Sequence, residues 1–257
     1  MRMPTLFVSH GAPDILLQPS KTLALWKSLG EKLPRPDAIL AVSAHWTTSS
    51  PLVGSAAHPR TIHDFGGFPR ELYQMHYDAP GAVELAYRVE SLLNEANIPI
   101  QRDPSYGLDH GAWVPLKYLY PDTSIPVTQL SVQPGHGTQW HLNLGKALSA
   151  LRDENVLILA SGSITHNFGW LSAPGSPEFP PAVQFSDWVA EKIEQKDISA
   201  LLDYRNLAPY GAEAHPTDEH FLPLFIALGA SLADDSHRYV SEFTYGALAM
   251  DAYQFGA

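Results

Sequence analysis

The sequence contains no cysteine, and this absence excludes several classes of site at once. Without a thiol there is no disulfide framework, no cysteine nucleophile and no zinc site built from thiolates. The absence fits a reducing compartment. Histidine is then the obvious side chain to bind a transition metal, and the 257 residues include 12 histidines, roughly twice what we expect of an average protein.

Basic side chains are also scarce. The chain has 16 lysines and arginines against 27 aspartates and glutamates, which gives a formal net charge of −11. A nucleic-acid-binding surface needs a basic face, and so does a surface that binds anionic membranes. We therefore expect neither a nucleic acid nor a membrane among the partners of this protein.

Long apolar runs are missing as well. No run approaches 18 residues, so we expect no membrane-spanning helix. The apolar run near the N-terminus is too short for a signal peptide, and we predict a cytoplasmic protein. The chain also lacks GxGxxG after a strand, GxxxxGK[ST], GxSxG and HExxH. Dinucleotide-binding, P-loop, serine-hydrolase and zincin functions therefore have no motif to support them.

Short apolar runs alternate along the chain with longer segments of helical periodicity. This order predicts one layered α/β domain, residues 1–257, with a largely parallel central sheet. Residues 51–80 show little periodicity and are expected to form a long loop that acts as a lid or binding wall. We expect strands at 5–10, 36–46, 98–103, 125–132, 156–161 and 244–255, and helices at 20–33, 81–97, 137–155, 180–197 and 217–231.

Three of the expected strands lead into a histidine. His10 ends the run TLFVSH, His45 follows AILAVSA, and His166 comes shortly after VLILAS. Sites in open α/β sheets form outside the carboxyl ends of the strands, so three such imidazoles can converge on one metal ion. Each histidine alone could equally be a hydrogen-bonded residue at the edge of the sheet. The three together favour a metal site.

A fourth ligand is expected from the stretch HPTDEHFLPL. With Thr217 as an N-cap, His220 falls in the first turn of a helix, from which its side chain can point into a cleft. Glu219 is the alternative ligand at this place. Acidic residues are also common at a helix start without binding anything, because they interact favourably with the helix dipole.

His110 lies in the stretch YGLDHGAW, which we expect to be a loop. Placed between Asp109 and Gly111, it could act as a catalytic acid or base that the aspartate orients. The alternative is an Asx-type turn without a catalytic role.

His63, in TIHDFGGFP, is open to the same two interpretations. Its aromatic neighbours Phe65 and Phe68 would suit the wall of a site for an aromatic substrate. The other histidines are expected to be surface or structural residues: His58, His76, His136, His141, His215 and His237.

Six stretches in order resemble the class III extradiol ring-cleavage dioxygenases, the family of protocatechuate 4,5-dioxygenase. They are most similar to the branch of the 4,5-DOPA extradiol dioxygenases and their bacterial relatives, from about residue 4 to about residue 250. The resemblance implies a single three-layer αβα domain with a largely parallel or mixed sheet. The stretches are SHGAP, LPRPDAILAVSAHW, TIHDFGGFP, YGLDHGAW, LASGSITHN and PTDEHFLPL.

Carried over to this sequence, the resemblance implies that His10 and His45 bind the metal. His166 and His220 match positions described as metal-binding in the DOPA branch. In the wider superfamily the third ligand is a glutamate and the histidine matching His166 is the catalytic base. His166 is therefore a ligand or a base, and Glu219 is an alternative to His220. His110 resembles a family histidine close to the substrate and to dioxygen.

The resemblance implies extradiol cleavage of a DOPA-like catechol by O₂ with one divalent metal ion. We expect Fe²⁺ for turnover and Zn²⁺ as a metal that an isolated sample carries. His110 and His166 would transfer protons, and the sequence is compatible with a homo-oligomer. Two alternatives remain: an amidase-like zinc hydrolase and a non-enzymatic metal-binding relative. The substrate-binding candidates are His63, Phe65, Trp113 and Tyr253.

Overall fold

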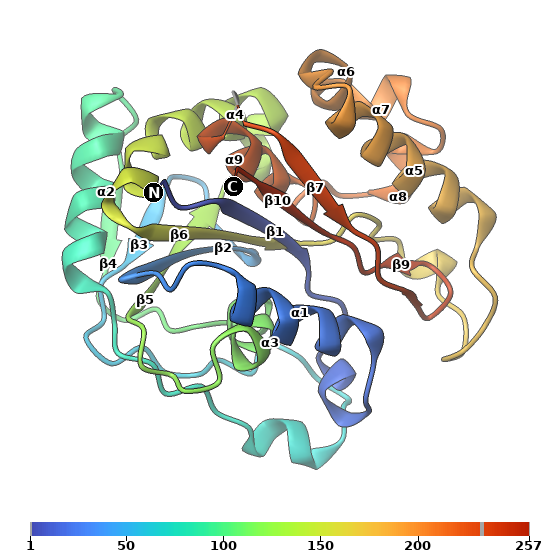
Figure 1. The fold of residues 1–257 in the computed structure, drawn as a ribbon, viewed down its shortest axis with the longest axis horizontal. Coiled ribbons are helices and arrows are strands. Elements are labelled where there is room, and N and C mark those ends of the chain that lie inside the picture. The colour runs from blue at the N-terminus through green and yellow to red at the C-terminus, as the bar shows by residue number, and fades with distance from the viewer. Residues whose placement is uncertain (1, 232–233, 257) are drawn as a thin grey trace.

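A mixed sheet of eight strands forms the centre of the computed structural model, which describes residues 2–231 and 234–256 (Figure 1). The strand order is β4-β3-β5-β2-β6-β1-β10-β7, and the central strands β5, β2, β6 and β1 are parallel. The strands of this sheet are β1 (Thr5–Ser9), β2 (Ala38–Thr47), β3 (Leu52–Gly54), β4 (Gln101–Asp103), β5 (Val127–Val132), β6 (Val156–Gly162), β7 (Ser236–Tyr239) and β10 (Ala252–Phe255).

Helices cover both faces of this sheet, so the molecule has three layers (Figure 1). Helices α1 (Lys21–Lys32) and α3 (His110–Leu119) pack on one face. Helices α2 (Val83–Glu95), α4 (Gly137–Ala147) and α9 (Leu222–Ala230) pack on the other. That second layer is extended by α5 (Pro180–Glu194), α6 (Ile198–Leu202), α7 (Tyr204–Leu207) and α8 (Gly211–Ala214).

The central strands explain the apolar runs of the sequence. Every residue of β1 and β6 is buried, because helices lie above and below them. A strand that is buried on both faces has no solvent-exposed face, so apolar and polar residues do not alternate along its sequence. The predicted α/β class and the predicted layered architecture are confirmed.

The carboxyl ends of β1, β2 and β6 meet at one edge of the sheet. Ser9 pairs with Gly162, and Ser43 pairs with Ser161, so residues that follow these positions lie side by side. The register between β2 and β5 shifts after Val42, and β2 continues to Thr47. His10 and His45 therefore lie at this same edge.

The last two expected elements differ from the structure. The expected helix 217–231 begins only at Leu222, because residues before it form a turn in which the amides of Phe221 and Leu222 donate to the Asp218 carbonyl. His220 therefore precedes the helix, and Thr217 is not its cap. The expected strand 244–255 is divided into the pair β8 (Phe243–Thr244) and β9 (Leu248–Ala249) and the separate β10.

Two other segments also differ from expectation, the first by having more secondary structure and the second by having a shorter α-helix. Residues 51–80 contain β3 and a 3-10 helix, η2 (Arg70–Gln74), and the part between them runs along the site described below. The expected helix 137–155 is α-helical only to Ala147 and continues as the 3-10 helix η4 (Ser149–Glu154). The remaining 3-10 helices are η1 (Pro13–Leu17), η3 (Pro134–His136) and η5 (Phe168–Trp170). Within the described ranges, no helix has the length and apolarity needed to cross a membrane.

Candidate active site

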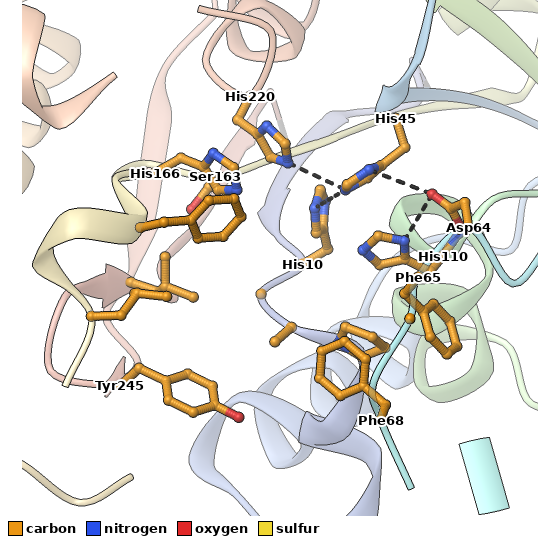
Figure 2. Close-up of a pocket in the computed structure, with 17 residues that line it drawn as sticks. His10, His45, Asp64, Phe65, Phe68, His110, Ser163, His166, His220 and Tyr245 are labelled. Carbon is orange, nitrogen blue, oxygen red and sulfur yellow. Dashed lines mark hydrogen bonds and ion pairs between the residues drawn. The ribbon is translucent and has the colours of Figure 1, made fainter. Parts of the chain in front are cut away.

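A cavity of about 470 Å³ opens at the edge of the sheet where β1, β2 and β6 end. Five histidines from distant parts of the sequence line it: His10, His45, His110, His166 and His220 (Figure 2). The rest of the cavity wall is largely apolar and includes phenylalanine and leucine side chains.

Three of these imidazoles point their Nε2 atoms at one place. The Nε2 atom of His45 lies 3.0 Å from that of His10 and 3.2 Å from that of His220. A metal ion about 2.0–2.1 Å from each nitrogen would set neighbouring ligand nitrogens roughly 2.9–3.4 Å apart. The observed spacings therefore suit three ligands of a single ion.

The opposite ring nitrogens are held by oxygen atoms. Nδ1 of His10 lies 2.9 Å from the hydroxyl of Ser161, which itself donates to the carbonyl of Gly111. The hydroxyl must then accept from Nδ1–H of His10, which leaves the Nε2 of that ring as a bare lone pair. Nδ1 of His220 likewise donates to the Glu219 carboxylate at 3.1 Å. Metal-binding histidines are typically oriented in this way.

The imidazoles of the cluster are neutral, and their arrangement suits a bound cation. Burial lowers the pKa of His10 and of His220 well below the usual value, and the neighbouring histidines lower it further. Burial, with the charge of His110, lowers the pKa of His45 to about 3. The Nε2 lone pairs of His10 and His220 both face Nε2 of His45, which has at most one proton and cannot satisfy both. The donor set fits a divalent metal ion.

Glycine at position 162 lets β6 support this arrangement. A Cβ atom there would lie 2.1 Å from the carbonyl oxygen of His220, a distance that no side chain tolerates. The amide of Ser163 donates to that same carbonyl at 2.8 Å. The end of β6 therefore holds the backbone of His220 directly.

His110 is the first residue of α3 and not a loop residue as expected. Asp109 is the N-cap, and its carboxylate accepts from the amide of Ala112. The carboxylate that orients His110 is Asp64, which accepts from the backbone amide at 2.9 Å and from Nδ1 at 3.0 Å. Asp109 instead faces the hydroxyl of Ser43 at 2.6 Å. The expectation that Asp109 orients the imidazole was wrong.

The Asp64 bond also fixes the tautomer of His110. When the ring is neutral, its one proton lies on Nδ1 and is donated to the carboxylate, so Nε2 keeps its lone pair. The ring packs on His45, with centroids 3.9 Å apart. Burial would raise the pKa of Asp64, but the hydrogen bonds and charge of His110 outweigh it and keep that pKa below its usual value.

His166 flanks the cluster on the other side. Its ring stacks on His220, with centroids 3.5 Å apart and planes 10° from parallel. By ligand-atom spacing alone, two groups of three residues could hold a metal ion: His10, His45 and His110, and His166, Glu219 and His220. Burial lowers the pKa of His166, so this imidazole is also neutral near pH 7. Figure 2 shows His166 and His110 on opposite sides of the three converging rings.

The four expected substrate contacts divide into one residue on the cavity wall and three that lie away from it. Phe65 lines the cavity, together with Phe68. His63 lies behind Phe65 and donates from Nε2 to the Met75 carbonyl at 2.9 Å.

Trp113 and Tyr253 are buried elsewhere. The indole of Trp113 lies in the core on α3 and donates to the Ile62 carbonyl at 3.0 Å. Tyr253 is on β10 and borders a separate groove beside Arg238. We propose no substrate contact for either residue.

Two residues of the site, Asp64 and Ser161, were not predicted from the sequence. Asp64 directly follows His63, and its carboxyl group could have suggested a partner for a histidine. Ser161, in the strand before His166, is a weaker indication, because a serine in a strand is common without such a role. Among the other histidines, His141 and His215 are buried with structural hydrogen bonds, and His58, His76, His136 and His237 are exposed, as predicted.

Comparison with known proteins identifies the family. Residues 5–252 match the family described as the catalytic LigB subunit of aromatic ring-opening dioxygenase. The chain belongs to this family. The protein is therefore an extradiol ring-cleaving dioxygenase, a metal-dependent enzyme that acts on a small aromatic substrate and O₂.

The relatives cover most of this dioxygenase. It is 42% identical over 237 residues to a 4,5-DOPA dioxygenase extradiol of Escherichia coli K12, which covers 89% of this chain and 85% of that protein. It is 39% identical to the Beta vulgaris protein of the same name, over 98% of this chain and 96% of that one. The crystal structure of an uncharacterized protein from Escherichia coli K12 superposes with a TM-score of 0.84 at 36% identity, covering 99% and 100% of the two chains.

Proposed function

We propose that this dioxygenase cleaves the ring of a DOPA-like catechol on an Fe²⁺ ion held by His10, His45 and His220. The observation that carries the proposal is the convergence of their Nε2 atoms: Nε2 of His45 lies 3.0 Å from that of His10 and 3.2 Å from that of His220. Glu219 supports His220 through Nδ1 and so acts behind the ligand. The names of the relatives, 4,5-DOPA dioxygenase extradiol, support the catechol.

The metal supplies the redox chemistry that lets O₂ react with a catechol. Both Fe²⁺ and Zn²⁺ accept imidazole ligands, and Zn²⁺ binds such a site more tightly but has no redox chemistry. We therefore expect zinc in a purified sample and turnover only with iron.

We assign proton transfer to His110 and His166. In its neutral form His110 presents an Nε2 lone pair that can accept a proton from a catechol hydroxyl, because Asp64 holds the ring proton on Nδ1. His166, neutral and on the opposite side, is the second group that can hold or return a proton. Phe65 and Phe68 form the adjacent aromatic wall for the ring.

Family membership decides against the two alternatives, a zinc hydrolase and a non-enzymatic relative. The natural catechol, the metal, the cytoplasmic location and a homo-oligomeric state remain predictions.

Oxygen uptake tests the proposal. Protein loaded anaerobically with Fe²⁺ should consume O₂ and DOPA in equal amounts, with loss of the catechol absorbance, and zinc-loaded protein should consume neither. Full activity in iron-free, zinc-loaded protein, or no O₂ uptake by the iron form with any of a panel of catechols, would contradict it.

A further inference from the structure

The end of the cavity away from the metal-site histidines has its own chemistry. Tyr245 and Phe68 lie on that side in Figure 2, and Ala12 and Pro13 also border the cavity. None of the described residues that line the cavity is a lysine or an arginine. The one lining carboxylate, Asp64, is beside His45 and His110.

Tyr245 occupies an unusual backbone position for its type. It has φ of +52° and is followed by Gly246 at +69°, in the turn between β8 and β9. A left-handed conformation suits glycine or asparagine and costs a larger residue about 1–2 kcal/mol. Two hydrogen bonds from other segments hold the turn, from Ser172 to the Tyr245 carbonyl and from Phe179 to the Gly246 carbonyl. A strained tyrosine aimed at a cavity suggests a role for its side chain.

That side chain is joined to a carboxylate. The hydroxyl of Tyr245 donates to Asp14, which directly follows Pro13 of the cavity wall and is half-buried. The hydroxyl of Ser163, also on the wall, donates to the Thr165 carbonyl at 2.7 Å. The hydroxyls of the cavity wall, Tyr245 at this end and Ser163 beside His166, have therefore given their protons to protein acceptors (Figure 2). The Tyr245 oxygen can then only accept a hydrogen bond from a ligand, because its one proton is donated to Asp14.

An accepting hydroxyl oxygen with a carboxylate behind it favours a ligand group that donates. An ammonium group can donate to the Tyr245 oxygen and is attracted by Asp14, whereas a carboxylate meets no donating side chain and no cation among the described residues of that end. An unpaired charged group in a largely apolar cavity is strongly disfavoured.

We propose that the Tyr245–Asp14 end of the cavity selects catechols whose side chain ends in an ammonium group over those whose side chain ends in a carboxylate. This inference rests on the proposed catechol cleavage. It names the chemistry of the substituent, which the metal site does not determine.

Three catechols with the same ring test the selection in the Fe²⁺-loaded enzyme. Dopamine carries only an ammonium group, 3-(3,4-dihydroxyphenyl)propionate carries only a carboxylate, and 4-methylcatechol is uncharged. We expect kcat/KM for dopamine to exceed that for the propionate at least about tenfold, with 4-methylcatechol between them. The Asp14→Asn variant should lower the dopamine-to-propionate ratio about tenfold.

Asp37→Asn is the matched control, because Asp37 is exposed and far from the cavity wall, and its variant should keep the wild-type ratio. Equal kcat/KM for dopamine and the propionate, a preference for the propionate, or an unchanged ratio in Asp14→Asn would overturn the inference. These results leave ring cleavage itself intact. Consumption of none of the three catechols would instead overturn the proposed function and the inference with it.

Discussion

Two histidines that lie side by side, His45 and His110, should have different tasks. His45 presents Nε2 to the cluster, whereas His110 is held by Asp64 beside it. The His110→Ala variant should keep its metal and lose turnover about 10²–10⁴-fold, the usual contribution of one positioned acid–base group. His45→Ala should lose metal and activity together. Metal stoichiometry and oxygen uptake, measured in parallel, separate the two, and loss of metal from His110→Ala would place that residue among the ligands.

Asp64 should act through the tautomer of His110. In Asp64→Asn, the amide oxygen can still accept from the His110 backbone, but the amide nitrogen would donate to Nδ1 and move the ring proton to Nε2. The value of kcat should fall at least about 10²-fold, by analogy with the loss of one positioned base, while KM and metal content stay near wild type.

Asp37→Asn, an exposed change of the same type, should be neutral in that assay. If Asp64→Asn lost its metal instead, the carboxylate would serve mainly His45, which lies 3.4 Å from it through Nδ1.

For single residues, the sequence predicts which histidines belong to the site better than it predicts the side chains that they contact. His10 and His45 could be found because each stands at the end of an apolar run. The Asp64–His110 pair could not, because its members are 46 residues apart and no periodic pattern connects them. Whether His166 is a ligand or a base was likewise open, because the sequence does not show that Nε2 of His220 lies 3.2 Å from that of His45 while the His166 ring stacks on His220.

At the scale of elements, the contact of β6 with the His220 backbone should be sensitive to a single methyl group. Gly162→Ala should lower the stability by about 1–3 kcal/mol, as overpacking typically does, and should reduce metal occupancy because His220 must shift. Gly135→Ala is the control, because a Cβ there meets nothing within 4 Å. Thermal unfolding and metal titration measure both effects, and an unchanged Gly162→Ala variant would show that the end of β6 does not position His220.

The central strands could be predicted from the sequence, because burial on both faces leaves continuous apolar runs. The first residues of the helices were harder to predict. Asp109 was taken as part of a turn, although it caps α3. Thr217 was taken as a cap, although its hydroxyl donates to Glu219 and the helix starts five residues later. Capping residues and turn residues are the same types, so only the fold distinguishes them.

For the whole molecule, the buried histidines predict loss of stability in mild acid. Burial lowers the pKa of His45 to about 3 and that of His215 to about 3, from 6.5. The unfolded chain therefore binds protons at these positions as the pH falls below 6.5, while the folded chain does not, and the stability declines from pH 6.5 down toward pH 3. His45 and His215 should each lower the free energy of unfolding by up to about 2 kcal/mol between pH 6.5 and pH 5.

Thermal unfolding of metal-free protein should show a Tm that falls steadily from pH 7 to 5. A Tm that does not change over this range would show that these imidazoles are not buried in the neutral form.

The layered α/β architecture followed from the order of strands and helices, and the site followed from the edge where parallel strands end. The sequence did not show how the C-terminal segment folds back. There the Tyr245–Gly246 turn separates β8 from β9 and brings a tyrosine to the far side of the cavity.

A crystal structure of the protein loaded anaerobically with Fe²⁺, with anomalous data at the iron edge, would locate the metal and identify its ligands. We expect one iron within about 2.0–2.2 Å of Nε2 of His10, His45 and His220, with His110 and His166 outside the ligand set. Iron bound instead by His166 and Glu219, or no iron at the meeting point of β1, β2 and β6, would contradict this expectation.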